Sequence, residues 1–146
     1  MQSTVIEKSL KKNCSIYRGI YACDELPVID WTSRPFAIVV NTDPVRRPGQ
    51  HWICMYFDEE GHGEFFDSFG LRPKDVFERY MNNNCTAWTF NTKQMQSIIS
   101  RFCGHYCIWY CMMKNRKATL NELTNCMTND TSLNDFLVHR FACKLI

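Results

Sequence analysis

Long apolar runs are absent from this chain of 146 residues, and their absence excludes two classes of protein. No stretch approaches the roughly 18 apolar residues that a transmembrane helix needs. The N-terminal stretch MQSTVIEKSLKKNC has no apolar core of the kind that a secretory signal peptide carries. The sequence therefore predicts an intracellular protein that is neither secreted nor embedded in a membrane.

Net charge is also nearly absent, because 17 Lys and Arg against 15 Asp and Glu leave +2 at pH 7. So weak a balance gives no general affinity for nucleic acid, although the Arg46–Arg47 pair could make weak, non-specific contacts with DNA. A solvated loop is the simpler interpretation of that pair. No internal repeat or low-complexity tract divides the chain, so we expect one domain over residues 1–146.

Cysteine, by contrast, is abundant, with nine residues. An odd count in a chain of this size without a signal peptide favours reduced thiols over a disulfide framework. Cys103, Cys107 and Cys111 recur at four-residue steps, which keep side chains on one face of a helix. Zinc sites usually combine two CxxC or CxxH pairs, and this spacing supplies neither, so we expect no metal site. We interpret Cys107 and Cys111 as buried packing residues.

Apolar periodicity predicts strands in the middle of the chain and helices toward both ends. Strands are expected at 36–40 and 86–90, and in a hairpin formed by 51–57 and 63–69, whereas 17–35 is predicted to be a turn-rich segment. Helices are expected at 3–13, 72–83 and 103–115, and after the capping-box pairs Thr119–Glu122 and Ser132–Asp135. The predicted fold is α+β, with a small mixed β-sheet packed against the central buried helix 103–115.

Cys103 stands at the start of that helix, where unpaired N–H groups and the helix dipole favour a thiolate. Gly104 removes a side chain where a substrate backbone would approach. His51 opens one hairpin strand and Asp67 ends the other, so the turn can bring a general base beside its orienting acid. The side-chain amide of Gln96 could stabilise an oxyanion together with the N–H of Cys103.

Each of these residues also has a simpler structural interpretation. Asp67 could cap a turn, with Phe66 and Phe69 packed in the core. The remaining histidines carry no catalytic motif and are expected to be structural or solvated: His62, His105 and His139. What favours chemistry is the combination of QHW, FFDSFG, a glutamine and CGHYC in that order.

These motifs resemble those of the adenain-type cysteine proteases, which include the adenoviral maturation protease and relatives in Polinton/Maverick-type elements and adintoviruses. That family shares a clan with the Ulp1-like SUMO proteases. The resemblance is collinear over most of the chain, from IYRGIYACDELP through AIVVNTDPVRRPGQHW and GEFFDSFG to QMQSIISRFCGHYCIWYC.

The resemblance implies that Cys103 is the nucleophile, His51 the general base, Asp67 the orienting acid and Gln96 the oxyanion donor. Trp52 matches the aromatic residue that follows the family's histidine, where it would shape the substrate cleft and flank the imidazole. The implied reaction is cleavage of viral or virus-like capsid or core precursors through a thioester. The enzyme would be a monomer in the host cytoplasm, the host nucleus or the virion.

The sequence departs from the adenoviral pattern in several places. The acid is Asp67, as in the Ulp1-like branch, where adenoviral enzymes carry Glu. Gln94 competes with Gln96 for the oxyanion role, and the chain is short after the nucleophile helix. The sequence requires no cofactor, but the resemblance raises an activating peptide, DNA or both, with Cys85 as a possible attachment point for a peptide.

Two alternatives stay open. One is an isopeptidase acting on ubiquitin-like or SUMO-like modifiers, within the same clan. The other is a catalytically inactive, domesticated copy that serves as a binding module.

Overall fold

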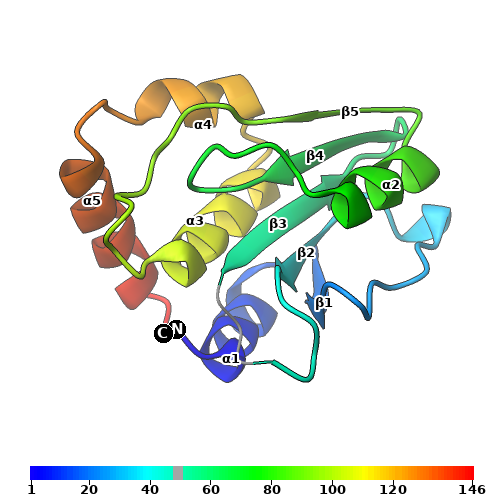
Figure 1. Cartoon of the computed structure of the whole chain (residues 1–146), viewed down its shortest axis with the longest axis horizontal. Coiled ribbons are helices and arrows are strands. Elements are labelled where there is room, and N and C mark those ends of the chain that lie inside the picture. The colour runs from blue at the N-terminus through cyan, green and yellow to red at the C-terminus, as the bar shows by residue number, and fades with distance from the viewer. Residues whose placement is uncertain (48–50) are drawn as a thin grey trace.

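The computed structural model describes residues 1–47 and 51–146 and is built around a five-stranded mixed sheet (Figure 1). The strands follow the spatial order β1 (Tyr17–Ala22), β2 (Phe36–Asn41), β3 (Trp52–Phe57), β4 (His62–Phe66) and β5 (Ala87–Phe90). The three central strands are antiparallel, whereas β1 and β5 each pair in parallel with their neighbours β2 and β4. The α+β class and the mixed sheet are as predicted.

Helices cover both faces of the sheet. One face packs against α3 (Cys103–Asn115), which is joined there by α1 (Ser3–Asn13), α4 (Leu120–Cys126) and α5 (Thr131–Cys143). The other face is covered by α2 (Asp75–Asn84), which lies across the sheet from α3 in Figure 1. A short 3-10 helix spans Trp31–Ser33. None of the helices in the described ranges has the length and apolar character needed to cross a membrane.

The two cores explain why FAIVV is a continuous apolar run. Along β2, Ala37 and Val39 face the α3 core, while Phe36, Ile38 and Val40 face the α2 core. A central strand covered by helices on both faces needs apolar side chains in both directions. Each large side chain buried in this way stabilises the fold by about 1.5–3 kcal/mol.

Helix α3 is surrounded by protein, as its apolar sequence predicts. Ten of its residues are buried, and three of its polar side chains find partners at the edges. Tyr106 donates a hydrogen bond to Asp135 Oδ1 of α5 at 2.8 Å. Tyr110 and Lys114 donate to the two carboxylate oxygens of Glu64, at 2.7 and 3.0 Å. These bonds fix α3 against both α5 and β4.

Three local predictions are wrong. The first half of the segment 17–35 is strand β1, whose pairing with β2 is irregular around Gly19 (φ +137°), so it lacks a clean alternating pattern. The chain leaves β4 after Phe66, not at Phe69. Helix α5 is capped by Asp130, which accepts from the N–H groups of its first turn, and not by a Ser132–Asp135 box. Asp135 instead receives the Tyr106 bond. The predicted Thr119 cap of α4 is confirmed.

Candidate active site

The hairpin of β3 and β4 places His51 beside Asp67. His51 directly precedes β3 and Asp67 directly follows β4, and the antiparallel register of Cys54 with Phe66 puts these two ends at the same edge of the sheet. His51 Nε2 donates to Asp67 Oδ1 at 2.8 Å. Both side chains are largely shielded, with 16% and 9% of their surfaces exposed. The hairpin therefore brings the two residues together as the sequence predicted.

A tight turn orients the Asp67 carboxylate. Its Oδ1 also accepts from the backbone N–H of Phe69 at 2.8 Å. The buried Asn91 bonds to both sides of the Asp67 backbone, donating to its carbonyl at 2.6 Å and accepting from its N–H at 3.0 Å. Gly70 closes the turn at φ +70°, and a Cβ there would lie 2.7 Å from the Lys93 backbone. The glycine of FFDSFG is thus a packing requirement.

Phe69 has a different place from the one predicted. Its ring is not fully buried in the core but stacks on the His51 imidazole, with ring centroids 4.8 Å apart and planes 25° from parallel. The aromatic side chain that flanks the imidazole face is therefore Phe69, whereas the Trp52 indole donates to the carbonyl of Met1 at 3.1 Å. Sequence reasoning missed Phe69 and Asn91, although both lie within three residues of an apolar strand end.

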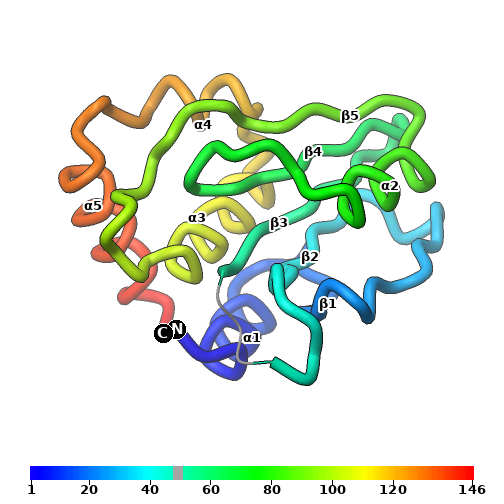
Figure 2. Tube along the Cα trace, in the orientation of Figure 1, coloured from blue at the N-terminus to red at the C-terminus, as the bar shows by residue number. Residues whose placement is uncertain are grey.

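Cys103 occupies the first turn of α3, directly across from His51. The residue is 8% exposed, and its thiol lies close enough to the His51 imidazole for each group to shift the pKa of the other. The backbone N–H groups of Trp52 and Gly104 also act on the thiol and lower its pKa. The chain reaches this point through residues 91–102, which run from the end of β5 past α5 to the start of α3 (Figure 2).

The two groups shift each other's pKa in opposite directions. Burial alone would lower the pKa of His51, but its hydrogen bonds and charge interactions with Asp67 and Cys103 outweigh burial and raise the pKa to about 9. Burial alone would raise the pKa of Cys103, but the His51 hydrogen bond, the Trp52 and Gly104 N–H groups and the His51 charge lower it. These shifts favour a thiolate–imidazolium pair at neutral pH.

Gly104 is not placed as predicted. A Cβ at this position would meet Met1 Cβ at 3.0 Å and Ile6 Cδ1 at 3.2 Å. The face of Gly104 therefore receives the N-terminal segment and α1, and the residue is buried. Close packing of α1 on α3, and not approach of a substrate backbone, accounts for the glycine.

Gln96 is buried, 1% exposed, in a polar network that reaches the Asp67 turn. Its Oε1 accepts from Ser68 Oγ at 2.6 Å, and its Nε2 donates to both the carbonyl and the hydroxyl of Ser100 at 3.1 Å. Gln94 donates instead to the Gln96 carbonyl at 3.0 Å. The rigid amide is thus Gln96, held in the segment that leads to Cys103, and its oxyanion role stays a prediction.

A groove of about 560 Å³ opens beside the site, with Trp52 in its wall. Its walls come from the N-terminal segment, β1 and the loop after β2: Met1, Gln2, Ser3, Thr4, Ile20, Tyr21, Ala22, Glu25, Asn41, Asp43, Pro44, Val45, Arg47 and Trp52. Because Trp52 directly follows His51 in the chain, the groove adjoins the site.

The other cysteines differ from Cys103 in their surroundings. Cys107 and Cys111 are fully buried on the α3 face that packs on the sheet, as predicted, and burial raises the pKa of Cys107 to about 11. Cys85 is half-buried behind β4, and burial raises its pKa to about 11 despite the opposing effect of Arg34. Of the seven cysteines in the described ranges whose pKa departs from its ordinary value, Cys103 alone has a lowered pKa.

Two curated viral proteins resemble the chain in sequence. The protease of bovine adenovirus 4 is 29% identical over 103 residues, which are 58% of this chain and 51% of that protein. A cysteine protease of African swine fever virus is 24% identical over 139 residues, which are 84% of this chain and 51% of that protein. The chain thus spans about half the length of the curated relatives it matches. No protein-family model matches it.

Solved structures agree with these relatives on the fold. The African swine fever virus pS273R protease superposes with a TM-score of 0.56 at 22% identity, over 79% of this chain and 44% of that one. The chain therefore resembles the adenain-like cysteine proteases in sequence and shares their fold. ChlaDub1 of Chlamydia trachomatis also has this fold, with a TM-score of 0.59 at 12% identity, over 75% of this chain and 58% of that one.

Proposed function

We propose that this adenain-like chain is a cysteine endopeptidase that uses Cys103, His51 and Asp67 as a catalytic triad. The observation that carries the proposal is the position of the His51 ring, which hydrogen-bonds to Asp67 Oδ1 at 2.8 Å and lies close enough to the Cys103 thiol for each group to shift the pKa of the other. The opposite pKa shifts of His51 and Cys103 support it, because they charge both members of the pair. The names of the viral relatives support the reaction class.

In the proposed first step, the Cys103 thiolate attacks the carbonyl carbon of the scissile peptide, and the carbonyl π electrons move to oxygen. The His51 imidazolium then gives its proton to the leaving nitrogen as the C–N bond breaks, which releases an amine and leaves a thioester on Cys103. Neutral His51 next takes a proton from water as the water oxygen attacks the thioester. Breaking the C–S bond restores the thiolate–imidazolium pair. Asp67 keeps the ring oriented throughout through its bond to Nε2.

The oxyanion would be stabilised by the N–H of Cys103 at the N-terminus of α3 and by the Gln96 amide. The Ser100 carbonyl can only accept, so its bond to Nε2 fixes which end of the Gln96 amide is the donor. Both Nε2 contacts go to Ser100, so the substrate oxygen would have to replace one of them. Because that exchange keeps the number of hydrogen bonds unchanged, its cost is small.

For the substrate we propose viral or virus-like structural precursors, cleaved inside the host cell or in the virion. The resemblance to the adenain-type proteases, whose cleft is narrow, implies small residues such as Gly around the scissile bond. The proposed enzyme acts as a monomer, because one chain supplies all three proposed triad residues. Binding of a peptide or of DNA would raise its activity.

Digestion of a peptide library made from virus-encoded structural proteins tests this function, with Cys103→Ala as the matched control. We expect cleavage products from the wild-type chain, with small residues at the cut, and none from the variant. Products that appear equally in both samples, or in neither when tested with and without DNA, would refute the proposal. A ubiquitin-like probe ending in Gly-Gly, added to the same protein, would label Cys103 if the isopeptidase alternative holds.

A further inference from the structure

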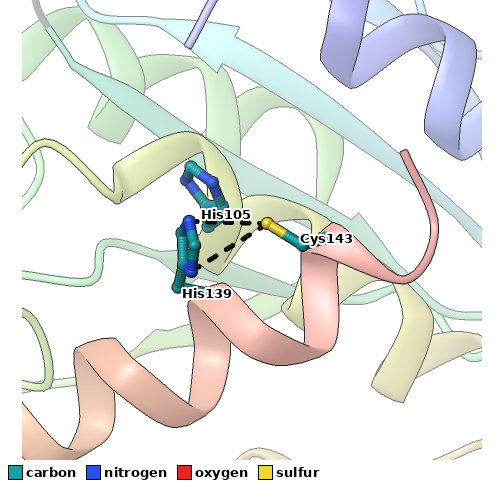
Figure 3. Close-up of side chains that lie close together, drawn as sticks. All are labelled: His105, His139 and Cys143. Atoms are coloured by element: carbon teal, nitrogen blue, oxygen red, sulfur yellow. Dashed lines mark hydrogen bonds between the residues drawn. The ribbon is translucent and has the colours of Figure 1, made fainter.

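Two histidines and a cysteine meet on the side of α3 that faces α5, outside the proposed triad (Figure 3). One ring nitrogen of His105, one of His139 and the sulfur of Cys143 all lie within 4.8 Å of one another. The Cys143 sulfur is 3.4 Å from His139 Nε2. Figure 3 shows the two imidazoles one above the other, with the sulfur beside them.

The arrangement follows from the packing of the two helices. His139 and Cys143 are four residues apart on α5, so they share one helical face. Phe102, just before α3, packs against both imidazoles, with ring centroids 5.1 Å from His105 and 5.0 Å from His139. The 2.8 Å bond from Tyr106 to Asp135 ties α5 to the first turn of α3. The packing of Phe102 and the Tyr106–Asp135 bond therefore help to hold the three side chains together.

A second observation concerns the His105 ring. Its Nδ1 is buried and has no hydrogen-bond partner among the described residues. Buried polar atoms nearly always find a partner, and exceptions call for an explanation such as an ion. His139 and Cys143 are exposed, so solvent reaches the cluster from the other side. The site is thus closed by protein on one side and open to an incoming ion on the other.

We propose that His105, His139 and Cys143 bind a borderline transition-metal ion of the Zn²⁺ class, with water as the fourth ligand. Two imidazoles and a thiolate are ligands that this class prefers. In a tetrahedral zinc site, bond lengths of about 2.0–2.3 Å put ligand atoms roughly 3.3–3.6 Å apart. The sulfur and His139 Nε2 already have that spacing. No separation in the cluster exceeds 4.8 Å, so the longest must close by up to about 1.5 Å, which rotation of the exposed His139 and Cys143 side chains can supply.

Such an ion would join the first turn of α3 to the end of α5, two residues along the chain from Cys103. It would hold the turn that presents the thiol without taking part in the proposed peptide cleavage. The Cys103–His51 pair is itself a potential zinc ligand set, since it combines a thiolate with an imidazole. An experiment must therefore distinguish zinc bound by His105, His139 and Cys143 from zinc bound by the Cys103–His51 pair.

The test uses the full chain carrying Cys103→Ala, which removes the competing thiolate and makes the result independent of the proposed protease activity. Zn²⁺ is titrated in competition with a chromophoric chelator, and Co²⁺ is added in a parallel sample to report a thiolate ligand by its charge-transfer absorption. We expect one equivalent of Zn²⁺, a thiolate–Co²⁺ band and a raised melting temperature with Zn²⁺.

Adding His139→Ala or Cys143→Ser should weaken Zn²⁺ binding by more than about 100-fold, because losing even an outer partner of a metal ligand costs 10–100-fold. Both positions are exposed, so neither change should disturb folding. The matched controls are Cys126→Ser, an exposed thiol on α4, and His62→Ala, an exposed imidazole at the start of β4, and both should bind as before. Equal binding in all variants, loss only in a control, or no bound equivalent in the Cys103→Ala chain would overturn the proposal.

Discussion

Removing the His51 imidazole should abolish the special reactivity of Cys103. The rise in the His51 pKa from 6.5 to about 9 corresponds to roughly 3 kcal/mol in favour of the imidazolium. Part of this free energy comes from the neighbouring thiolate, so the same coupling lowers the Cys103 pKa. In His51→Ala the lowering hydrogen bond and charge are both gone, while burial, which raises the Cys103 pKa, remains.

The magnitude follows from the thiolate fraction. A thiol with the ordinary pKa of 9.0 is about 1% ionised at pH 7, so the alkylation rate of Cys103 at this pH should fall by up to about 100-fold in His51→Ala. Asp67→Asn keeps a hydrogen-bonding side chain but removes the negative charge, so it should cause a smaller loss in the same direction.

The assay is iodoacetamide alkylation followed by mass spectrometry of each cysteine between pH 4 and 10. In wild-type protein, Cys103 should react well below pH 9, and its rate should change again near pH 9 as the imidazolium loses its proton. Cys126 is exposed and serves as the internal control. Cys103 reacting no faster than Cys126 at pH 6–7, or at an unchanged rate in His51→Ala, would refute the reasoning.

The free energy of unfolding should also depend on pH through His51 and Cys103. The raised His51 pKa contributes stability that is fully present below the unfolded pKa of about 6.5 and is lost as pH rises through about 9. The lowered Cys103 pKa contributes stability that is fully present above the unfolded thiol pKa of about 9 and is lost as pH falls through the lowered value.

Three further predictions concern the residues around the pair. Phe69→Ala removes the ring stacked on His51 and should lower the His51 pKa, followed by NMR titration, by up to about one unit, whereas Phe69→Tyr should leave it unchanged. Asn91→Ala leaves the buried N–H of Asp67 without a partner and removes one of two bonds to its carbonyl, which keeps the Gly70 N–H, so it should cost about 1–3 kcal/mol in urea unfolding; a loss below 0.5 kcal/mol would contradict this account. Gly70→Ala puts a Cβ against the Lys93 backbone at positive φ and should cost about 1–3 kcal/mol, visible as a lower melting temperature, while an unchanged melting temperature would show that the turn can relax.

The fold class could be read from the sequence because its main elements have strong local signals. FAIVV, the hairpin and the apolar helix 103–115 each have a hydrophobic pattern that few other structures satisfy. β1 could not be predicted in this way, because its strand pairing is irregular at Gly19 and depends on β2, a partner distant in the sequence. The start of α5 was misplaced because Asp135 fits a capping box by spacing, yet its carboxylate bonds to Tyr106 instead.

The sequence by itself determined which residues could perform the chemistry: a thiol at a helix start, and a histidine and an aspartate at the two ends of a hairpin. It could do so because strand pairing and helix polarity are local properties that fix these positions in advance. Only the tertiary structure decided what surrounds them. The ring on His51 is that of Phe69, Gly104 receives α1, and His105 meets His139 and Cys143 across two helices. Such contacts join segments far apart in the sequence, so they follow from how the whole chain packs and leave no local pattern.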